Sequence, residues 1–223
     1  MVNVSEIKSR GLKGSIWNFL NMMVNQLKTF IVSLILARLL MPADFGLVSM
    51  ALILNSILDF LVDFGFSSAI IQKETIDNKE VSTVFWLNLL IGGCCSIIAL
   101  CCAPLIAWFY EMSQLKSLIN VTAWSFLISS FGTLQTALFQ RALDFKSPFI
   151  AKLISGLVSG GIGIAMAFGG YGVWALVYSN VAGWVLYSVI IWIMSPWRPK
   201  FIFKLCLITD LSLIHISEPT RHA

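Results

Sequence analysis

Long apolar runs alternate with short polar connections along this chain. Each run reaches the roughly 20 residues that an α-helix needs to cross about 30 Å of hydrocarbon. The runs predict six membrane-spanning helices: Gly14–Leu39, Phe45–Ile71, Val81–Phe109, Leu115–Phe139, Pro148–Gly169 and Val173–Ser195. We therefore predict an all-α, polytopic membrane protein whose six helices form one lobe over residues 14–195.

The composition supports membrane spans and argues against a soluble domain. Hydrophobic residues make up 58% of the chain and charged residues only 12%, where a soluble domain carries about 25% charged residues. The net charge of +4 is spread between the apolar runs rather than clustered. We therefore predict membrane lipids as the surroundings and no nucleic-acid partner.

The basic residues of the connections predict the orientation. Short connections make consecutive helices antiparallel, and cytoplasmic loops are enriched in Lys and Arg. One side would hold only Arg38 and Lys116. The other would hold Lys8, Arg10, Lys13, Lys73, Lys79, Arg141, Lys146, Lys152, Arg198, Lys200 and Lys204. We predict a multi-pass membrane protein, with residues 1–13 as a cytoplasmic N-terminus and residues 196–210 as a cytoplasmic linker.

The last stretch differs from the rest of the chain. Residues Leu211–Arg221 read LSLIHISEPTR, which resembles the translation of a transposase sequencing adapter. We therefore expect the native sequence to stop near Asp210 and the tail over 211–223 to carry no function. Both histidines, His215 and His222, lie in this tail.

Polar residues recur on one face of the first predicted span. Asn18, Asn21, Asn25 and Lys28 follow one another at three- and four-residue spacing, which places them on one stripe of a helix. A lysine near the bilayer centre costs roughly 2.5–3.5 kcal/mol on insertion scales. We therefore predict that Lys28 either faces a water-filled cavity or forms a salt bridge with a neighbouring helix.

The second span offers a partner for that lysine. Ser56, Asp59 and Asp63 share a face, and antiparallel packing of the first two spans would bring them near the first stripe. Asp59 is the candidate ion-pair partner of Lys28, whereas Asp63 lies close enough to the interface to be hydrated.

Two further stripes carry small polar residues. The hydroxyls of the fourth span can satisfy carbonyls of their own helix, which favours helix packing. They are Thr122, Ser125, Ser129, Thr133 and Thr136, followed by Gln140. The small residues of the fifth span are typical of close helix approach, and we interpret them as packing rather than as a site. They are Ser155, Gly156, Ser159, Gly160 and Gly163.

Enzymatic signatures are absent from the sequence. It contains no GxSxG, GxxxxGK[ST], HExxH or paired CxxC motif, and these motifs mark hydrolases, phosphate loops and zinc sites. We predict no catalytic residue, no cofactor and no metal, and hence a protein that is not an enzyme.

Several local runs resemble the Wzx-type polysaccharide transporters, a flippase family related to the multidrug MATE exporters and the lipid II flippase. The colanic acid exporter type is the nearest likeness. The runs are Ala37–Met50, Asp63–Gln72, Thr83–Gly92, Phe139–Lys146, Gly170–Val177 and Trp197–Pro199.

The resemblance implies two similar lobes around a central cavity, of which this chain would supply the first. It implies a location in the bacterial inner membrane and translocation of an undecaprenyl-pyrophosphate-linked oligosaccharide to the periplasmic leaflet, with cationic cavity residues holding the pyrophosphate. Lys28 matches that role by position. Arg141, in the fourth family run, would either attract the substrate headgroup or obey the positive-inside rule. The candidate substrate-binding residues are thus Lys28, Asn21, Asn25, Asp59 and Arg141.

Three alternatives stay open at the level of sequence. An ion-coupled small-molecule exporter would use Asp59 as its ion site. A membrane glycosyltransferase or polymerase is disfavoured, because such enzymes carry a sizeable external loop and these connections are short. The third possibility is that the 223-residue chain is inactive by itself. We expect this because the C-terminal lobe, its expected partner, is missing.

Overall fold

A computed structural model describes residues 4–62, 70–71 and 76–200 of the chain, with side chains at residue 19 and over 22–56, 70–71 and 76–200. Over these residues the chain is helical with no strand. The helices are α1 (Val4–Leu39), α2 (Pro42–Val62), α4 (Asn78–Phe109), α5 (Ser113–Thr122), α6 (Trp124–Arg141), α7 (Lys146–Phe168) and α8 (Val173–Met194).

Three of the predicted spans match helices closely at both ends, whereas the predicted Gly14–Leu39 begins ten residues after α1 does. The third, fifth and sixth predicted spans agree with α4, α7 and α8 to within three residues at either end. Five stretches of the described residues are long and apolar enough to cross a membrane: Met22–Leu39, Asn78–Phe109, Ser113–Arg141, Lys146–Phe168 and Val173–Met194. The all-α, polytopic membrane fold is therefore confirmed. The second predicted span corresponds to α2 and continues into residues outside the described part, where Asp63 and the tail over 211–223 also lie.

The fourth predicted span is one apolar stretch, Ser113–Arg141, that is divided into two helices at a single residue. Helix α5 ends at Thr122 and α6 begins at Trp124, with Ala123 between them. The Ser96 hydroxyl of α4 donates a hydrogen bond of 2.9 Å to the Ala123 carbonyl. A side chain from a neighbouring helix thus bonds the carbonyl at the interruption.

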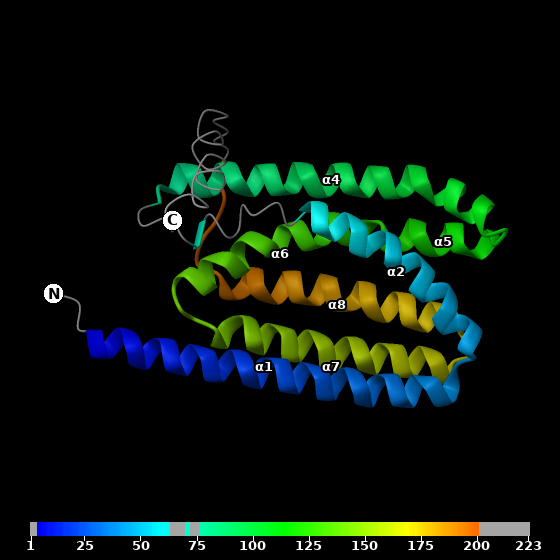
Figure 1. Cartoon of the computed structure of the whole chain (residues 1–223), viewed down its shortest axis with the longest axis horizontal. Helices are drawn as coiled ribbons and strands as arrows, with labels where there is room; N and C mark the ends of the chain where they lie inside the picture. Colours follow the sequence, from blue (N-terminus) through cyan, green and yellow to red (C-terminus); the bar gives the residue numbers. More distant parts are fainter. Residues whose placement is uncertain (1–3, 63–69, 72–75, 201–223) are drawn as a thin grey trace, which may run out of the picture.

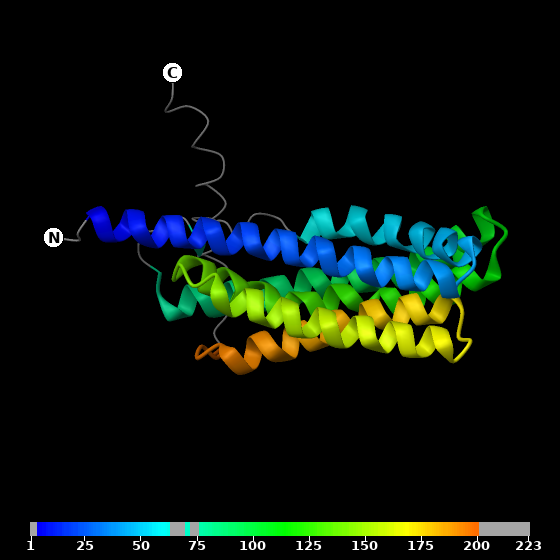
Figure 2. The same cartoon turned by 90° about the horizontal axis from the view of Figure 1, so that it is seen from below.

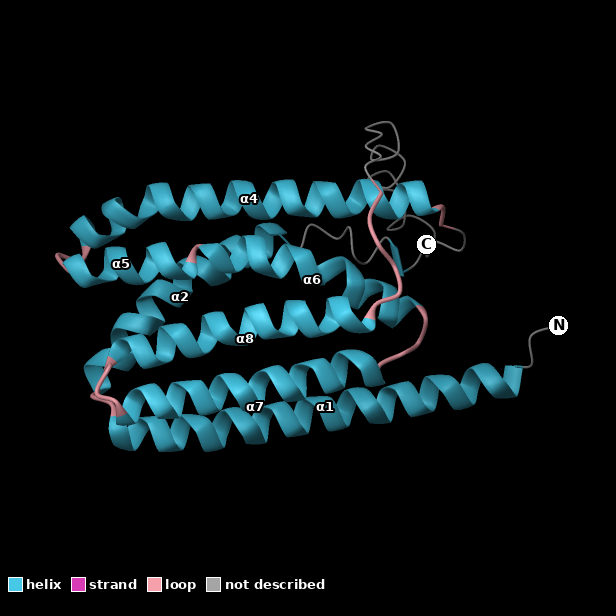
Figure 3. Ribbon diagram, turned by 180° about the vertical axis from the view of Figure 1, so that it is seen from behind, coloured by secondary structure: helices cyan, strands magenta, loops and turns pink. Residues whose placement is uncertain are grey.

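The helices lie side by side in a row with their connections at two opposite ends (Figure 1). In the view from behind, the row runs α1, α7, α8, α6 and α4, and α5 continues the line of α6 (Figure 3). Helix α2 packs against α4, α5 and α8. The turns after α1, α4 and α7 gather at one end, as the alternating orientation predicts.

Helix α1 packs along α7, and the two lie against each other in both views (Figures 1 and 2). The prediction that α1 packs along α2 is therefore wrong. Small residues on α7 explain the difference, because they let the α1 backbone approach closely. The side chain of Asp59 lies outside the described residues, so its pairing with Lys28 stays a prediction.

Most of the deeply buried apolar residues lie away from α1, although Leu36 of α1 is buried against Ala167 and Ala175. One cluster joins α2, α4, α5 and α8 around Leu115, Leu118 and Ile119, which are fully buried. A second joins α4 and α6 at the other end around Phe85 and Leu134. By contrast, only 6% of the apolar Met22–Leu39 window of α1 is buried. One side of the row is thus solidly packed, and the α1 side is open.

Candidate functional site

Two glycines of α7 set how closely α1 lies. A Cβ added at Gly156 would overlap the Lys28 ammonium, and one added at Gly160 would lie 2.9 Å from Val32 Cγ2. Real Cβ atoms essentially never come that close to another atom, so a methyl group added at either position would displace the α1 side chain that faces it. Gly156 therefore makes room for the charged end of Lys28.

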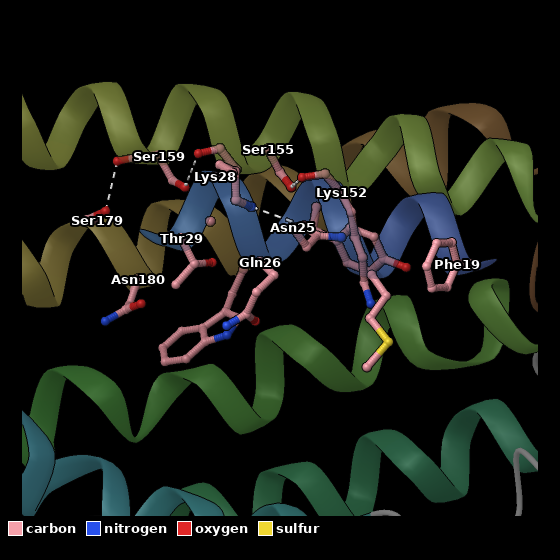
Figure 4. A pocket seen from close by; sticks show the side chains of 15 residues that line it. Phe19, Asn25, Gln26, Lys28, Thr29, Lys152, Ser155, Ser159, Ser179 and Asn180 are labelled. Atoms are coloured by element: carbon pink, nitrogen blue, oxygen red, sulfur yellow. Dashed lines mark hydrogen bonds between the residues drawn. The ribbon is translucent and has the colours of Figure 1, made fainter. Parts of the chain in front are cut away.

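Lys28 lies on α1 inside the apolar window that starts at Met22. Lys28 follows Met22 by six residues, a distance of about 9 Å along the helix axis. The half-buried Lys28 Nζ donates a hydrogen bond of 3.2 Å to Asn25 Oδ1. Figure 4 shows these side chains pointing toward one another from adjacent turns of α1. Two members of the predicted polar stripe are thus in contact.

A cleft of about 870 Å³ opens between α1, α7 and α8 around this lysine. We call it the basic cleft. It is lined by Phe19, Met22, Asn25, Gln26, Lys28, Thr29, Lys152, Ser155, Gly156, Ser159, Ser179, Asn180, Gly183, Trp184 and Tyr187. Among these described lining residues are two cations, Lys28 and Lys152, and no carboxylate.

The serines of the basic cleft bond to backbone carbonyls. Ser155 donates to the Lys152 carbonyl at 3.1 Å and Ser159 to the Gly156 carbonyl at 3.3 Å. Ser179 of α8 donates at 2.8 Å to the Ser159 carbonyl and so joins α8 to α7. The interpretation of the fifth-span stripe as packing alone is therefore incomplete. Gly160 and Gly163 pack against neighbouring helices, while Ser155, Gly156 and Ser159 also line the cleft.

A second, smaller cleft of about 410 Å³ lies between α6, α7 and α8. We call it the hydroxyl cleft. It is lined by Ile71, Ser129, Thr133, Thr136, Ala137, Gln140, Lys152, Trp184, Tyr187 and Ser188. Lys152, Trp184 and Tyr187 line both clefts, so the two are adjacent along α7 and α8. The fourth-span stripe is thus divided, since Thr122 and Ser125 are buried and the later members face this cleft.

The predicted site residues divide into three groups. Lys28 and Asn25 meet in the basic cleft. Arg141 lies elsewhere, at the end of α6, where its Nη1 donates to the Ile70 carbonyl at 2.6 Å. The side chains of Asn21 and Asp59 lie outside the described residues. In the described part of the chain, no group of His, Cys, Asp and Glu is placed to hold a metal ion.

The sequence reasoning missed Lys152, Trp184 and Tyr187 as site residues. The positive-inside pattern groups Lys152 with the loop charges, although Lys152, Ser155 and Ser159 have the three- and four-residue spacing of one helix face. That spacing was the available signal. No comparable signal exists for Trp184 and Tyr187, because both lie inside the apolar helix α8, whose sequence does not indicate which of its aromatic residues face a cleft.

The chemistry of the basic cleft is that of an anion site. An ammonium has three donor protons and no acceptor, and Lys binds phosphate as a point charge. Amide side chains of Asn25, Gln26 and Asn180 line the same cleft and can supply further donors. A phosphate or carboxylate group is therefore the ligand class that these side chains favour.

Comparison with known proteins gives the family. A family model described as "Polysaccharide biosynthesis protein" matches residues 35–217, and it runs into the adapter-like stretch, whose origin stays a prediction. The chain is 28% identical over 147 residues to the teichuronic acid biosynthesis protein TuaB of Bacillus subtilis (strain 168), which is 65% of this chain and 30% of the relative. No solved structure matches the chain significantly.

Two further relatives align over more of the chain. The succinoglycan biosynthesis transport protein ExoT of Rhizobium meliloti (strain 1021) is 25% identical, and the lipopolysaccharide biosynthesis protein WzxC of Escherichia coli (strain K12) is 23% identical. Each alignment covers 82% of this chain and 37% of the relative. The chain thus spans about a third of the length of these relatives, and the name of ExoT is that of a transport protein. With the family model covering most of its length, the chain belongs to the polysaccharide biosynthesis protein family of Wzx-type flippases that its sequence runs resemble.

Proposed function

We propose that this chain forms one lobe of a flippase that moves lipid-linked oligosaccharide repeat units across the bacterial inner membrane. The observation that carries the proposal is the basic cleft, in which Lys28 and Lys152 face one open space without a described carboxylate. Two ammonium groups and nearby amides suit the pyrophosphate that links such a saccharide to its lipid carrier.

The proposal includes a second lobe that faces the basic cleft and completes the cavity. The open side of the row at α1 supports this, because its apolar window is hardly buried. The fraction of each relative that this chain spans also supports it. The N-terminus is proposed to be cytoplasmic, since Lys79, Arg141, Lys146 and Lys200 are at the end of the row where α1 begins.

Polysaccharide export tests the role of the two lysines. The two-lobed protein, its N-terminus tagged, is expressed in a strain that lacks the flippase gene, and surface polysaccharide is measured. Lys28→Ala and Lys152→Ala are each expected to lower export about tenfold or more, because a hydrogen bond to a charged group contributes about 1.5–3 kcal/mol. Lys116→Ala is the control, since Lys116 is exposed on α5 and does not line the cleft.

Unchanged export in the Lys28→Ala, Lys152→Ala double variant would overturn the anion-binding role. Export of a small molecule by a preparation without any lipid-linked saccharide would favour the ion-coupled exporter instead. Fractionation of the same cells should recover the tagged protein with the inner membrane. A tag that is accessible from the periplasm would overturn the proposed orientation.

A further inference from the structure

The hydroxyl groups that line the hydroxyl cleft share one hydrogen-bonding pattern. Four of its hydroxyls donate their protons to helix carbonyls: Ser129 to Phe126 at 3.1 Å, Thr133 to Ser129 at 2.9 Å, Thr136 to Gly132 at 2.9 Å and Ser188 to Ile128 at 2.9 Å. A hydroxyl has one proton and two lone pairs. Each of these oxygens can therefore still accept a hydrogen bond from a ligand but has no proton left to donate.

The phenol of Tyr187 follows the same pattern. Its oxygen lies 2.8 Å from Thr136 Oγ1. Because the single Thr136 proton goes to the Gly132 carbonyl, Tyr187 must be the donor in this pair. The chain of bonds runs from Tyr187 through Thr136 to the backbone, and bonds in such a chain strengthen one another. Tyr187 thus adds another oxygen acceptor and fixes α8 against α6.

The wall of the hydroxyl cleft therefore discriminates between ligand classes. An ionised phosphate has acceptors only, so a surface of acceptor oxygens repels it. A saccharide carries many hydroxyl protons, and acceptor oxygens suit it. Among the described lining residues, donors are confined to Lys152, at the edge shared with the basic cleft, and to the amide of Gln140 and the indole of Trp184.

The aromatic residues connect the two clefts. Trp184 and Tyr187 line both the hydroxyl cleft and the basic cleft. An indole presents a flat apolar face and one donor, which matches the C–H face and the ring oxygens of a pyranose. A single ligand with an anionic part and a polyhydroxylated part could therefore lie across both clefts.

We propose that the hydroxyl cleft is a saccharide subsite that binds the first sugar residues next to the pyrophosphate, with Ser129, Thr133, Thr136 and Tyr187 accepting sugar hydroxyls and Trp184 stacking on a ring. This inference rests on the proposed function, because it divides that substrate between two adjacent clefts. It assigns the uncharged part to α6 and α8 and leaves the phosphate to Lys28 and Lys152.

Binding measurements on the purified two-lobed protein in detergent test the division. The probes are inorganic pyrophosphate and the neutral repeat-unit oligosaccharide released from the cell's own surface polysaccharide, each titrated by calorimetry. Thr133→Val keeps the side-chain shape and removes one acceptor. It is expected to weaken oligosaccharide binding about two- to tenfold, the range for one neutral hydrogen bond, and to leave pyrophosphate binding unchanged. Lys28→Ala is expected to do the reverse.

Thr122→Val is the matched control. Thr122 also donates its hydroxyl proton to a carbonyl of its own helix, that of Ile119 at 3.3 Å, but it is buried and does not line the cleft. The control should therefore bind both probes like the wild type. Equal oligosaccharide affinity in the wild type and in a Ser129→Ala, Thr133→Val double variant would overturn the subsite. If the wild type fails to bind pyrophosphate, the proposed function fails instead, and oligosaccharide binding that still depends on Thr133 would keep the subsite.

Discussion

Two glycines of this protein lie directly opposite a side chain of a neighbouring helix, and they serve different purposes. Gly92 of α4 faces Ser130 of α6, and Gly156 of α7 faces Lys28 of α1. At both positions an added Cβ would overlap the side chain opposite. In sequence, both belong to the small-residue patterns that indicate close helix packing.

The two contacts differ in what stands opposite the glycine. At Gly92 the obstacles are the buried Ser130 side chain and the backbone carbonyl of Phe126, which an added Cβ would approach to 2.7 Å. At Gly156 the obstacles are the Nζ, Cε and Cδ atoms of Lys28, the far end of a flexible side chain. The first glycine therefore holds two backbones together, and the second shapes the position of a charge.

The surroundings of the two contacts support this difference. Helices α4 and α6 meet around buried residues such as Phe126 and Ala99, whereas Gly156 lines the basic cleft. A small residue in a membrane helix can thus serve packing or a site. What decides between the two is the residue on the facing helix.

Of the substitutions that test this difference, Gly92→Ala is expected to change the free energy of unfolding most. The methyl group cannot be accommodated by rotating a side chain, because backbone of α6 lies opposite. Overpacking of a tight contact costs about 1–3 kcal/mol, so the free energy of unfolding in detergent should fall by that amount. Chemical denaturation followed by circular dichroism measures it.

Gly93→Ala is the control for that substitution. It adds the same methyl group one residue along α4, where the added Cβ would lie 3.9 Å from Leu127 Cδ1, an ordinary contact. Equal stability of the two variants would contradict the view that Gly92 holds α4 and α6 together.

Gly156→Ala is expected to have a smaller effect on stability and a distinct one on binding. The Lys28 side chain can move away from the new methyl group, so the unfolding free energy should change by less than about 1 kcal/mol. The ammonium, however, leaves its position beside Asn25, and affinity for pyrophosphate should fall by about threefold to tenfold. Calorimetric titration of the purified protein checks the affinity.

Gly161→Ala serves as the comparison for Gly156→Ala, since nothing lies within 4 Å of a Cβ added there. If Gly156→Ala bound pyrophosphate like Gly161→Ala while losing stability like Gly92→Ala, Gly156 would be a packing residue and the two contacts would be alike.

Most of the fold could be predicted from the sequence, because hydrophobic length is a strong constraint in a membrane. The predicted ends of α7 and α8 differ from the structure by two residues or fewer. The interruption at Ala123 could not be predicted, since it coincides with a hydrogen bond from Ser96, 27 residues away in the chain. The packing of α1 on α7 could not be predicted either. Periodicity shows which residues share one face of a helix, but it does not show which helix that face contacts.

The site could be predicted only where its residues share one helix. Asn25 and Lys28 are separated by three residues, and helical periodicity alone brings them together. Lys152, Trp184 and Tyr187 join them through the packing of α1 on α7 and of α7 on α8. That arrangement depends on contacts across helices, such as Gly156 with Lys28, which leave no periodic signal in a single sequence.

The smallest change in unfolding free energy that we predict comes from removing one serine hydrogen bond between helices. Two such bonds, one in the packed region and one beside the basic cleft, can be compared. Ser96 donates to the Ala123 carbonyl at 2.9 Å in the packed region, and Ser179 donates to the Ser159 carbonyl at 2.8 Å beside the basic cleft. Such interhelical bonds contribute about 0.6 kcal/mol on average in membrane proteins. Ser96→Ala should cost about that amount, because no water reaches the carbonyl it leaves unpaired. Ser179→Ala should cost less, because water in the cleft can replace the hydroxyl. Unfolding free energies measured side by side in one detergent would contradict the comparison if Ser179→Ala proved the more destabilising of the two.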